Sequence, residues 1–146
     1  MKVLRALASV VVLAIASQTA AAPLARPAAA VAGLAPLGEK DMRRTRETGC
    51  QSAFTHGQDT LIFMIGHDFM IRTTSGLAIC RISDRQFGTF GDGPTTIACG
   101  SRRFAIRRTG RIIAHEEADS AEGPALLTVM QGRAKTAIKG DWGTAC

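Results

Sequence analysis

The densest group of reactive side chains in this 146-residue chain is the polar loop from His115 to Glu122. The loop holds one histidine, four carboxylates and Ser120, the side-chain types that hydrolases use as base, acid and nucleophile. Neither a GxSxG elbow nor an HExxH motif surrounds them, and the members of a catalytic triad generally come from separate elements. A small hydrolase or metal-dependent enzyme using the His115–Glu122 loop is therefore the alternative function.

The spacing of the histidines and of the cysteines disfavours metal binding. His56, His67 and His115 show no HExxH or HxH pattern. Successive cysteines lie 30, 19 and 47 residues apart, without the CxxC-like spacing of zinc sites. The sequence therefore predicts neither a metal site nor a cofactor.

The four cysteines are better explained as disulfides. An even count in an exported chain is typical of a small domain that is stabilised by cross-links. If each half of the domain is cross-linked separately, the pairs are Cys50–Cys80 and Cys99–Cys146, which we favour. The alternative pairs Cys50 with Cys146 and Cys80 with Cys99, and would tie the two ends of the domain together.

Basic residues concentrate in one short segment. The chain has a formal net charge of +6, but from Cys50 onward eleven Lys and Arg oppose nine Asp and Glu. Phe104 and Ile106 should face the core, which places Arg103 and Arg107 on the opposite face, because alternate residues of a strand share a face. We predict a ligand-binding surface for an anion, formed by Arg103, Arg107, Arg108 and Arg111.

The chemistry of that surface limits its partners. An anionic envelope polymer or an acidic protein fits clustered arginines. Nucleic acid is disfavoured because Tyr is absent and Trp142 is the only Trp, whereas single-strand binding needs aromatic stacking platforms. The alternative is that these arginines simply pair with the acidic loop that follows them, since most surface charge contributes only solvation and weak pairing.

The elements that would position these residues are strands. Residues 61–82 read as three strands with tight turns at Gly66 and at Ser75-Gly76, and residues 95–113 read as a weaker copy. The first of these strands is apolar on both faces, which indicates burial on both sides. We expect an all-β fold, a disulfide-linked antiparallel meander closing into a barrel or sandwich of about eight to ten short strands.

The chain divides into three parts. Residues 1–21 have the charged start, short apolar stretch and small residues of a secretory signal. Residues 22–49 read as an Ala/Pro-rich and charged linker with one short helix near 39–48. Residues 50–146 form the all-β domain. We therefore predict a periplasmic or secreted, non-enzymatic binding or envelope-associated module, without a transmembrane segment once the signal is removed.

Overall fold

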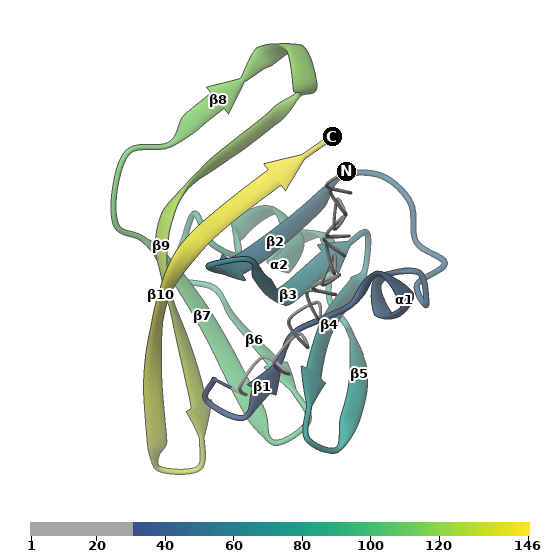
Figure 1. Cartoon of the computed structure of the whole chain (residues 1–146), viewed down its shortest axis with the longest axis vertical. Coiled ribbons are helices and arrows are strands. Elements are labelled where there is room, and N and C mark those ends of the chain that lie inside the picture. Colours follow the sequence, from purple (N-terminus) through teal and green to yellow (C-terminus); the bar gives the residue numbers. More distant parts are fainter. Residues whose placement is uncertain (1–30) are drawn as a thin grey trace, which may run out of the picture.

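The computed structural model describes residues 31–146, so the predicted signal segment lies outside the described residues. The described part is an all-β fold with little helix, as the sequence predicts (Figure 1). Its strands are β1 (Leu34–Ala35), β2 (Gln51–His56), β3 (Asp59–Ile65), β4 (Asp68–Thr73), β5 (Gly76–Arg81), β6 (Thr96–Cys99), β7 (Arg102–Arg108), β8 (Ile113–His115), β9 (Ser120–Gln131) and β10 (Ala134–Ala145). The helices are α1 (Glu39–Met42), α2 (Asp84–Thr89) and a 3-10 turn, η1 (Glu116–Ala118).

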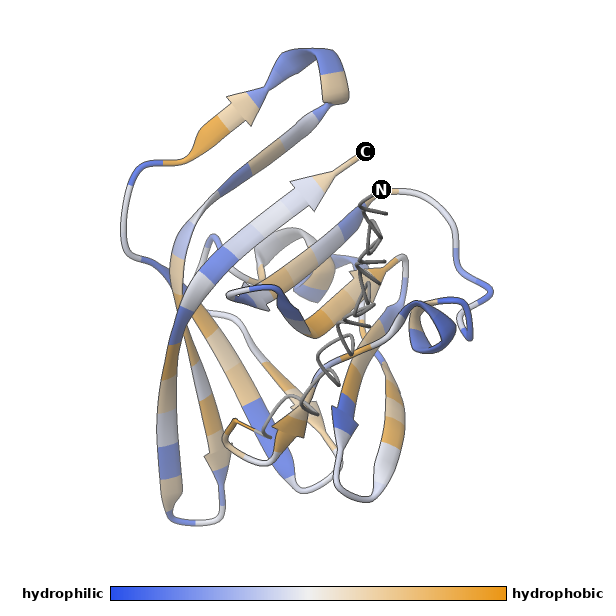
Figure 2. Cartoon of the chain, in the orientation of Figure 1, coloured by the Kyte–Doolittle hydropathy of each residue, from blue (hydrophilic) through white to orange (hydrophobic). Residues whose placement is uncertain are grey.

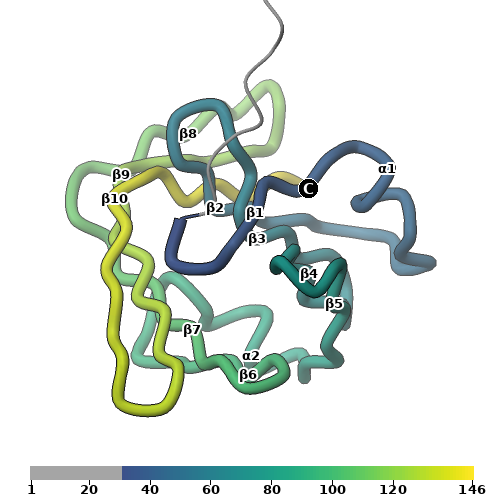
Figure 3. The backbone as a smooth tube through the Cα atoms, turned by 60° about the horizontal axis from the view of Figure 1, so that its bottom comes forward, coloured from purple at the N-terminus to yellow at the C-terminus, as the bar shows by residue number. Residues whose placement is uncertain are grey.

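One antiparallel sheet contains all of these strands. Its order is β1-β4-β3-β2-β10-β9-β7-β6, with β5 paired to β4 and β8 paired to β9. The sheet curls into a half-barrel, which Figure 3 shows from its lower end. A single curled sheet excludes the sandwich that the sequence left open, because a sandwich needs two separate sheets facing each other.

The first predicted meander is present as expected. β3, β4 and β5 form two consecutive hairpins, and their turns contain Gly66 and Gly76, at φ of +54° and +119°. Glycine is favoured at these two positions because other residues meet a Cβ clash at positive φ.

The second meander differs from its expected form. β6 and β7 form a hairpin, but the other neighbour of β7 is β9, and residues 113–115 pair with β9 instead of β7. The chain crosses over β9 at Gly123, where a Cβ would sit 2.7 Å from the carbonyl oxygen of Arg111. Arg108 and Arg111 therefore do not flank a hairpin turn.

The last hairpin is formed by the two longest strands of the described part. β9 and β10 each run for twelve residues around Gly132 and pair along their full length. Figure 2 shows hydrophobic and hydrophilic residues following one another along both strands. The upper part of β9 pairs with β8 to form an exposed arm, residues 109–122, above the rest of the sheet (Figure 1).

The core fills the inside of the curl. Phe90 lies between Phe69 and Trp142, with ring centroids 5.7 Å and 5.5 Å away and edge-to-face geometry on both sides. Phe90 follows α2, in the connection that spans the gap between β5 and β6. Phe90 is buried, while Phe87 is half-buried against the same cluster.

The doubly apolar strand β3 has a cover that the sequence did not identify. Phe63 and Met70 lie on the outer side of the sheet and pack with Leu37 in a second buried cluster. Leu34 is completely buried, and β1 pairs with β4. Residues 31–42 therefore pack on the domain, although the sequence analysis placed them in a linker. The same segment covers one face of β4.

Polar contacts also hold this N-terminal segment against the sheet. The predicted short helix is α1, which ends at Met42 rather than near residue 48. Arg72 on β4 donates to both carboxylate oxygens of Asp41 in α1. The hydrogen bond from Arg72 lowers the pKa of the Asp41 carboxyl to about 2. Beyond α1, Thr45 donates to the buried Asp68 at 2.6 Å, so the cover is held by charge as well as by apolar packing.

The disulfide pairing that we favoured is wrong, and the alternative pairing is present. Cys50 is bonded to Cys146, and Cys80 is bonded to Cys99. The first bond joins the ends of β2 and β10, which are already neighbours in the sheet. The second joins β5 to β6 across the gap that no ladder of hydrogen bonds closes. Both Cys80 and Cys99 face the core, as expected.

Trypsin separates all four cysteines and provides a direct test. A non-reduced digest is expected to contain Glu47–Arg72 linked to Gly140–Cys146, and Thr73–Arg81 linked to Gln86–Arg102. Mass spectrometry before and after reduction identifies each linked pair. Recovery of Glu47–Arg72 linked to Thr73–Arg81 would restore the separately cross-linked halves and contradict the pairing described above.

Candidate functional site

The outer face of the curled sheet carries two predicted arginines. Arg103 and Arg107 are exposed, while Phe104 and Ile106 between them are buried. Because a strand rises about 3.3 Å per residue, the Cα atoms of these two arginines lie about 13 Å apart. The alternation that the sequence predicted for this strand is therefore present.

Strand order adds two lysines to the same face. Arg103 lies opposite Met130 of β9, and Met130 lies opposite Lys135 of β10. In the same way, Leu126 lies between Arg107 and Lys139. The four cations thus occupy the corners of a rectangle across three strands, which we call the basic face: Arg103, Arg107, Lys135 and Lys139.

These four cations have no acidic partner within ion-pair distance among residues 31–146. The acidic loop after β8 does not pair with them, so the expectation that the two opposite clusters neutralise each other is not met. The outward position of Lys135 and Lys139 could be read from the inward Ile138. Their place beside the arginines depends on the pairing of β7 with β9.

Arg108 and Arg111 do not belong to the basic face. Arg108 points toward the core side, donates to the carbonyl oxygen of Trp142 at 2.6 Å and pairs with Asp92 at 3.1 Å. Arg111 is exposed on the loop that crosses β9. The predicted set of four arginines is therefore split, with only Arg103 and Arg107 on one open strand surface.

A groove adjoins the basic face. It has a volume of about 640 Å³ and is lined by Ala105, Arg107 and Thr128 of the sheet, by the 91–95 loop and by Ile112. Ile112 is 45% exposed, so one wall of the groove is apolar and open to solvent. Arg107 consequently has both an open side and a concave side on which a ligand group can be held.

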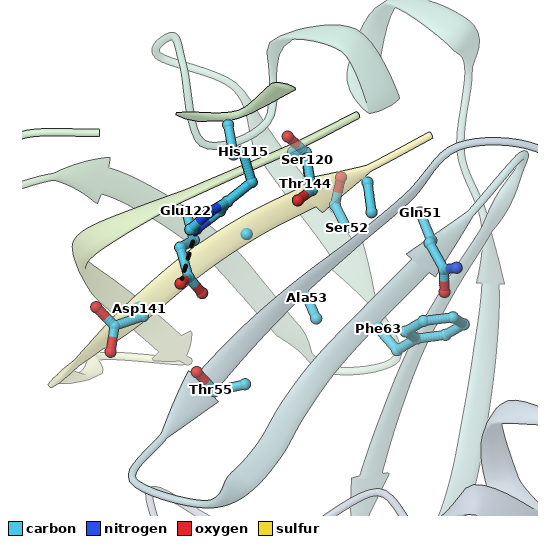
Figure 4. Close-up of a pocket in the computed structure, with 13 residues that line it drawn as sticks. Gln51, Ser52, Ala53, Thr55, Phe63, His115, Ser120, Glu122, Asp141 and Thr144 are labelled. Carbon is cyan, nitrogen blue, oxygen red and sulfur yellow. Dashed lines mark ion pairs between the residues drawn. The ribbon is translucent and has the colours of Figure 1, made fainter. Parts of the chain in front are cut away.

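A second concavity lies on the upper part of the sheet (Figure 4). We call it the trough; its volume is about 340 Å³. His115, Ser120 and Glu122 line it from the arm, and Nε2 of His115 lies 3.5 Å from Oε1 of Glu122. Asp141 of β10 lines the same trough, and no sequence pattern groups it with the loop.

Within residues 31–146, no group of three or more His, Cys, Asp or Glu side chains is arranged to hold a metal ion. No helix in this part of the chain is long and apolar enough to cross a membrane. His56 and His67 lie outside the trough; each has Nδ1 within hydrogen-bond distance of a backbone carbonyl oxygen, of Lys139 and Ile82 respectively.

Comparison with known proteins gives no family to which this chain can be assigned: no family model, no curated protein and no solved structure matches it. The class of protein is therefore defined by the fold alone, as a disulfide-linked, curled antiparallel sheet.

Proposed function

We propose that this protein is an exported, non-enzymatic binding module whose basic face binds an anionic envelope polymer or an acidic protein. The observation that carries the proposal is the rectangle of Arg103, Arg107, Lys135 and Lys139, without acidic partners in the described part of the chain. Two disulfides suit the oxidising compartment that export implies.

The distances between the four cations of the basic face favour an extended ligand. The corners lie about 13 Å apart along each strand and about 10 Å apart across the three strands, since neighbouring strands are about 4.8 Å apart. A single small anion cannot contact all four cations at these distances, whereas a polymer or a protein surface with repeated carboxylates can. Thr128 and Ala137 in the middle of the rectangle are short, and Leu126 and Met130 between its corners are half-buried, so a ligand can approach the four cations.

The test uses polygalacturonate as the anionic probe and neutral dextran as its control. Replacing all four corner residues by glutamine is expected to weaken binding at least about fourfold, since each exposed charge contact contributes about 0.2–1 kcal/mol. Binding by the wild type should also fall steeply with salt, because exposed charges are screened within about 8 Å at physiological ionic strength. Titration followed by the fluorescence of Trp142 or by calorimetry measures both effects.

A matched control keeps the number of removed charges comparable. Arg46 and Arg85 are exposed, lie away from the basic face and have no acidic partner within ion-pair distance in the described structure. Their double replacement by glutamine is compared with Arg103→Gln combined with Arg107→Gln. Equal weakening by both double variants would mean that only net charge matters, and would contradict a site at the basic face.

A hydrolase using the His115–Glu122 loop is the second candidate function. One observation favours it: Ser120 pairs across the strands with His115, and Nε2 of that histidine lies 3.5 Å from Oε1 of Glu122. No hydrogen bond joins Ser120 to His115 among the described residues, although a nucleophile must reach its base. Covalent labelling of Ser120 by a fluorophosphonate, lost in Ser120→Ala, would favour the enzyme over the binding module.

A further inference from the structure

We propose that the trough is a second binding site, for a ligand that carries a protonated amine on a small hydroxylated ring, as an amino sugar does. The trough lies on the same outer side of the sheet as the basic face but at the opposite end of the β9–β10 hairpin. Its charge has the opposite sign, so this proposal does not depend on the anionic ligand proposed above.

The floor of the trough is flat because of strand register. Gly143 of β10 lies between Glu122 of β9 and Ala53 of β2, and Ala53 lies opposite Phe63 of β3. The middle of this row therefore carries no side chain larger than a methyl group. Figure 4 shows the result, with Glu122 on one side of the floor and Phe63 on the other.

The ionised groups that line the trough are acidic. Glu122 and Asp141 are carboxylates on neighbouring strands, two positions apart along the sheet, so their Cα atoms lie about 7–8 Å from each other. No Lys or Arg lines the trough, and His115 is the one other titratable residue there. An ammonium group has three donors, and two carboxylates at this separation can both accept from it.

The charged residues next to the trough differ in sign on its two sides. Lys139 lies two residues before Asp141 on the same strand face and marks the start of the basic face. On the arm, Glu116, Glu117 and Asp119 add negative charge beyond His115. The field of the outer surface therefore changes sign near Asp141, which favours a cation on the trough side.

The volume and polarity of the trough indicate the size and chemistry of the rest of the ligand. About 340 Å³ is within the range of sites for small organic molecules and is far larger than a bare metal ion needs. Gln51 and Thr55 add an amide and a hydroxyl group along the β2 side of the trough. A six-membered ring with hydroxyl groups can lie on the Gly143–Ala53 floor and reach these groups.

The test compares two sugars that differ in charge. Glucosamine carries a protonated amine, whereas N-acetylglucosamine has a similar ring and a neutral amide. Titration of the mature chain by NMR is expected to show glucosamine binding with shifts at residues of the trough, and binding of N-acetylglucosamine at least about tenfold weaker, as the loss of a charge-assisted hydrogen bond implies. Equal binding of both sugars, or no binding of glucosamine at 20 mM, would overturn the proposal.

Single substitutions test whether glucosamine binds in the trough. Glu122→Gln and Asp141→Asn are nearly isosteric and exposed, and each is expected to weaken glucosamine binding about fivefold or more. Glu117→Gln on the arm is the matched control and should leave the affinity unchanged. Gly143→Leu should block the floor with its side chain. The fold should tolerate this substitution, because a Cβ at Gly143 has its nearest neighbour at an ordinary 3.5 Å.

The two proposed sites can fail separately. The glutamine variants of the basic face should bind glucosamine like the wild type, and Glu122→Gln should bind polygalacturonate like the wild type. If Glu117→Gln weakens glucosamine binding as much as Glu122→Gln does, general negative charge explains the binding and the trough is not the site.

Discussion

A chain that begins at Gly49 is expected not to fold cooperatively, although it contains the whole domain that the sequence delimits. The truncation removes Leu34 and Leu37 and uncovers Phe63 and Met70. Each fully buried side chain of this size contributes about 1.5–3 kcal/mol, so the combined loss exceeds about 5 kcal/mol. That loss is comparable with the whole stability of a small domain, which starts at about 5 kcal/mol.

Urea unfolding followed by Trp142 fluorescence measures the effect. The control is a chain that begins at Val31 and keeps β1, α1 and the Asp41–Arg72 contact. It should unfold in one transition at the same urea concentration as the longer mature chain. If the chain from Gly49 unfolds at that concentration too, the packing of residues 31–42 on the sheet contributes nothing to stability.

Phe90→Ala is expected to lower the free energy of unfolding by about 3–5 kcal/mol, the usual cost of truncating a buried aromatic ring to alanine. Phe90 is 1% exposed and joins Phe69 on β4 to Trp142 on β10. It fills the side of the curl where β5 and β6 are not hydrogen-bonded to each other. Removal of the ring should leave a cavity there, because the Cys80–Cys99 bond keeps the two strands together.

The matched control is Phe87→Ala in the same connection. Phe87 is half-buried and only packs on the edge of the core, so a smaller loss is expected from the same substitution. Both variants keep the two disulfides, which separates packing from cross-linking. An equal loss for Phe87→Ala and Phe90→Ala would show that Phe90 has no special role in closing the curl.

The basic face shows which side-chain positions the local sequence pattern can predict. Alternation around Phe104 and Ile106 predicted the outward position of Arg103 and Arg107, because the direction of a side chain in a strand depends only on its neighbours. The same rule at the end of β7 turns Arg108 inward, where it bonds to Asp92 and the Trp142 carbonyl. Arg108 therefore does not belong to the predicted arginine surface.

What the sequence determined by itself is the strands of the first meander, their tight turns, and the need for a cover on the doubly apolar β3. The tertiary structure alone decided which segment forms that cover, which cysteines are bonded, and which charges share a face. Cys50 and Cys146 are 96 residues apart in sequence and are neighbours only because β2 pairs with β10. Side-chain alternation is a property of adjacent residues, whereas strand order is selected by the packing of the whole core, and no single segment carries that information.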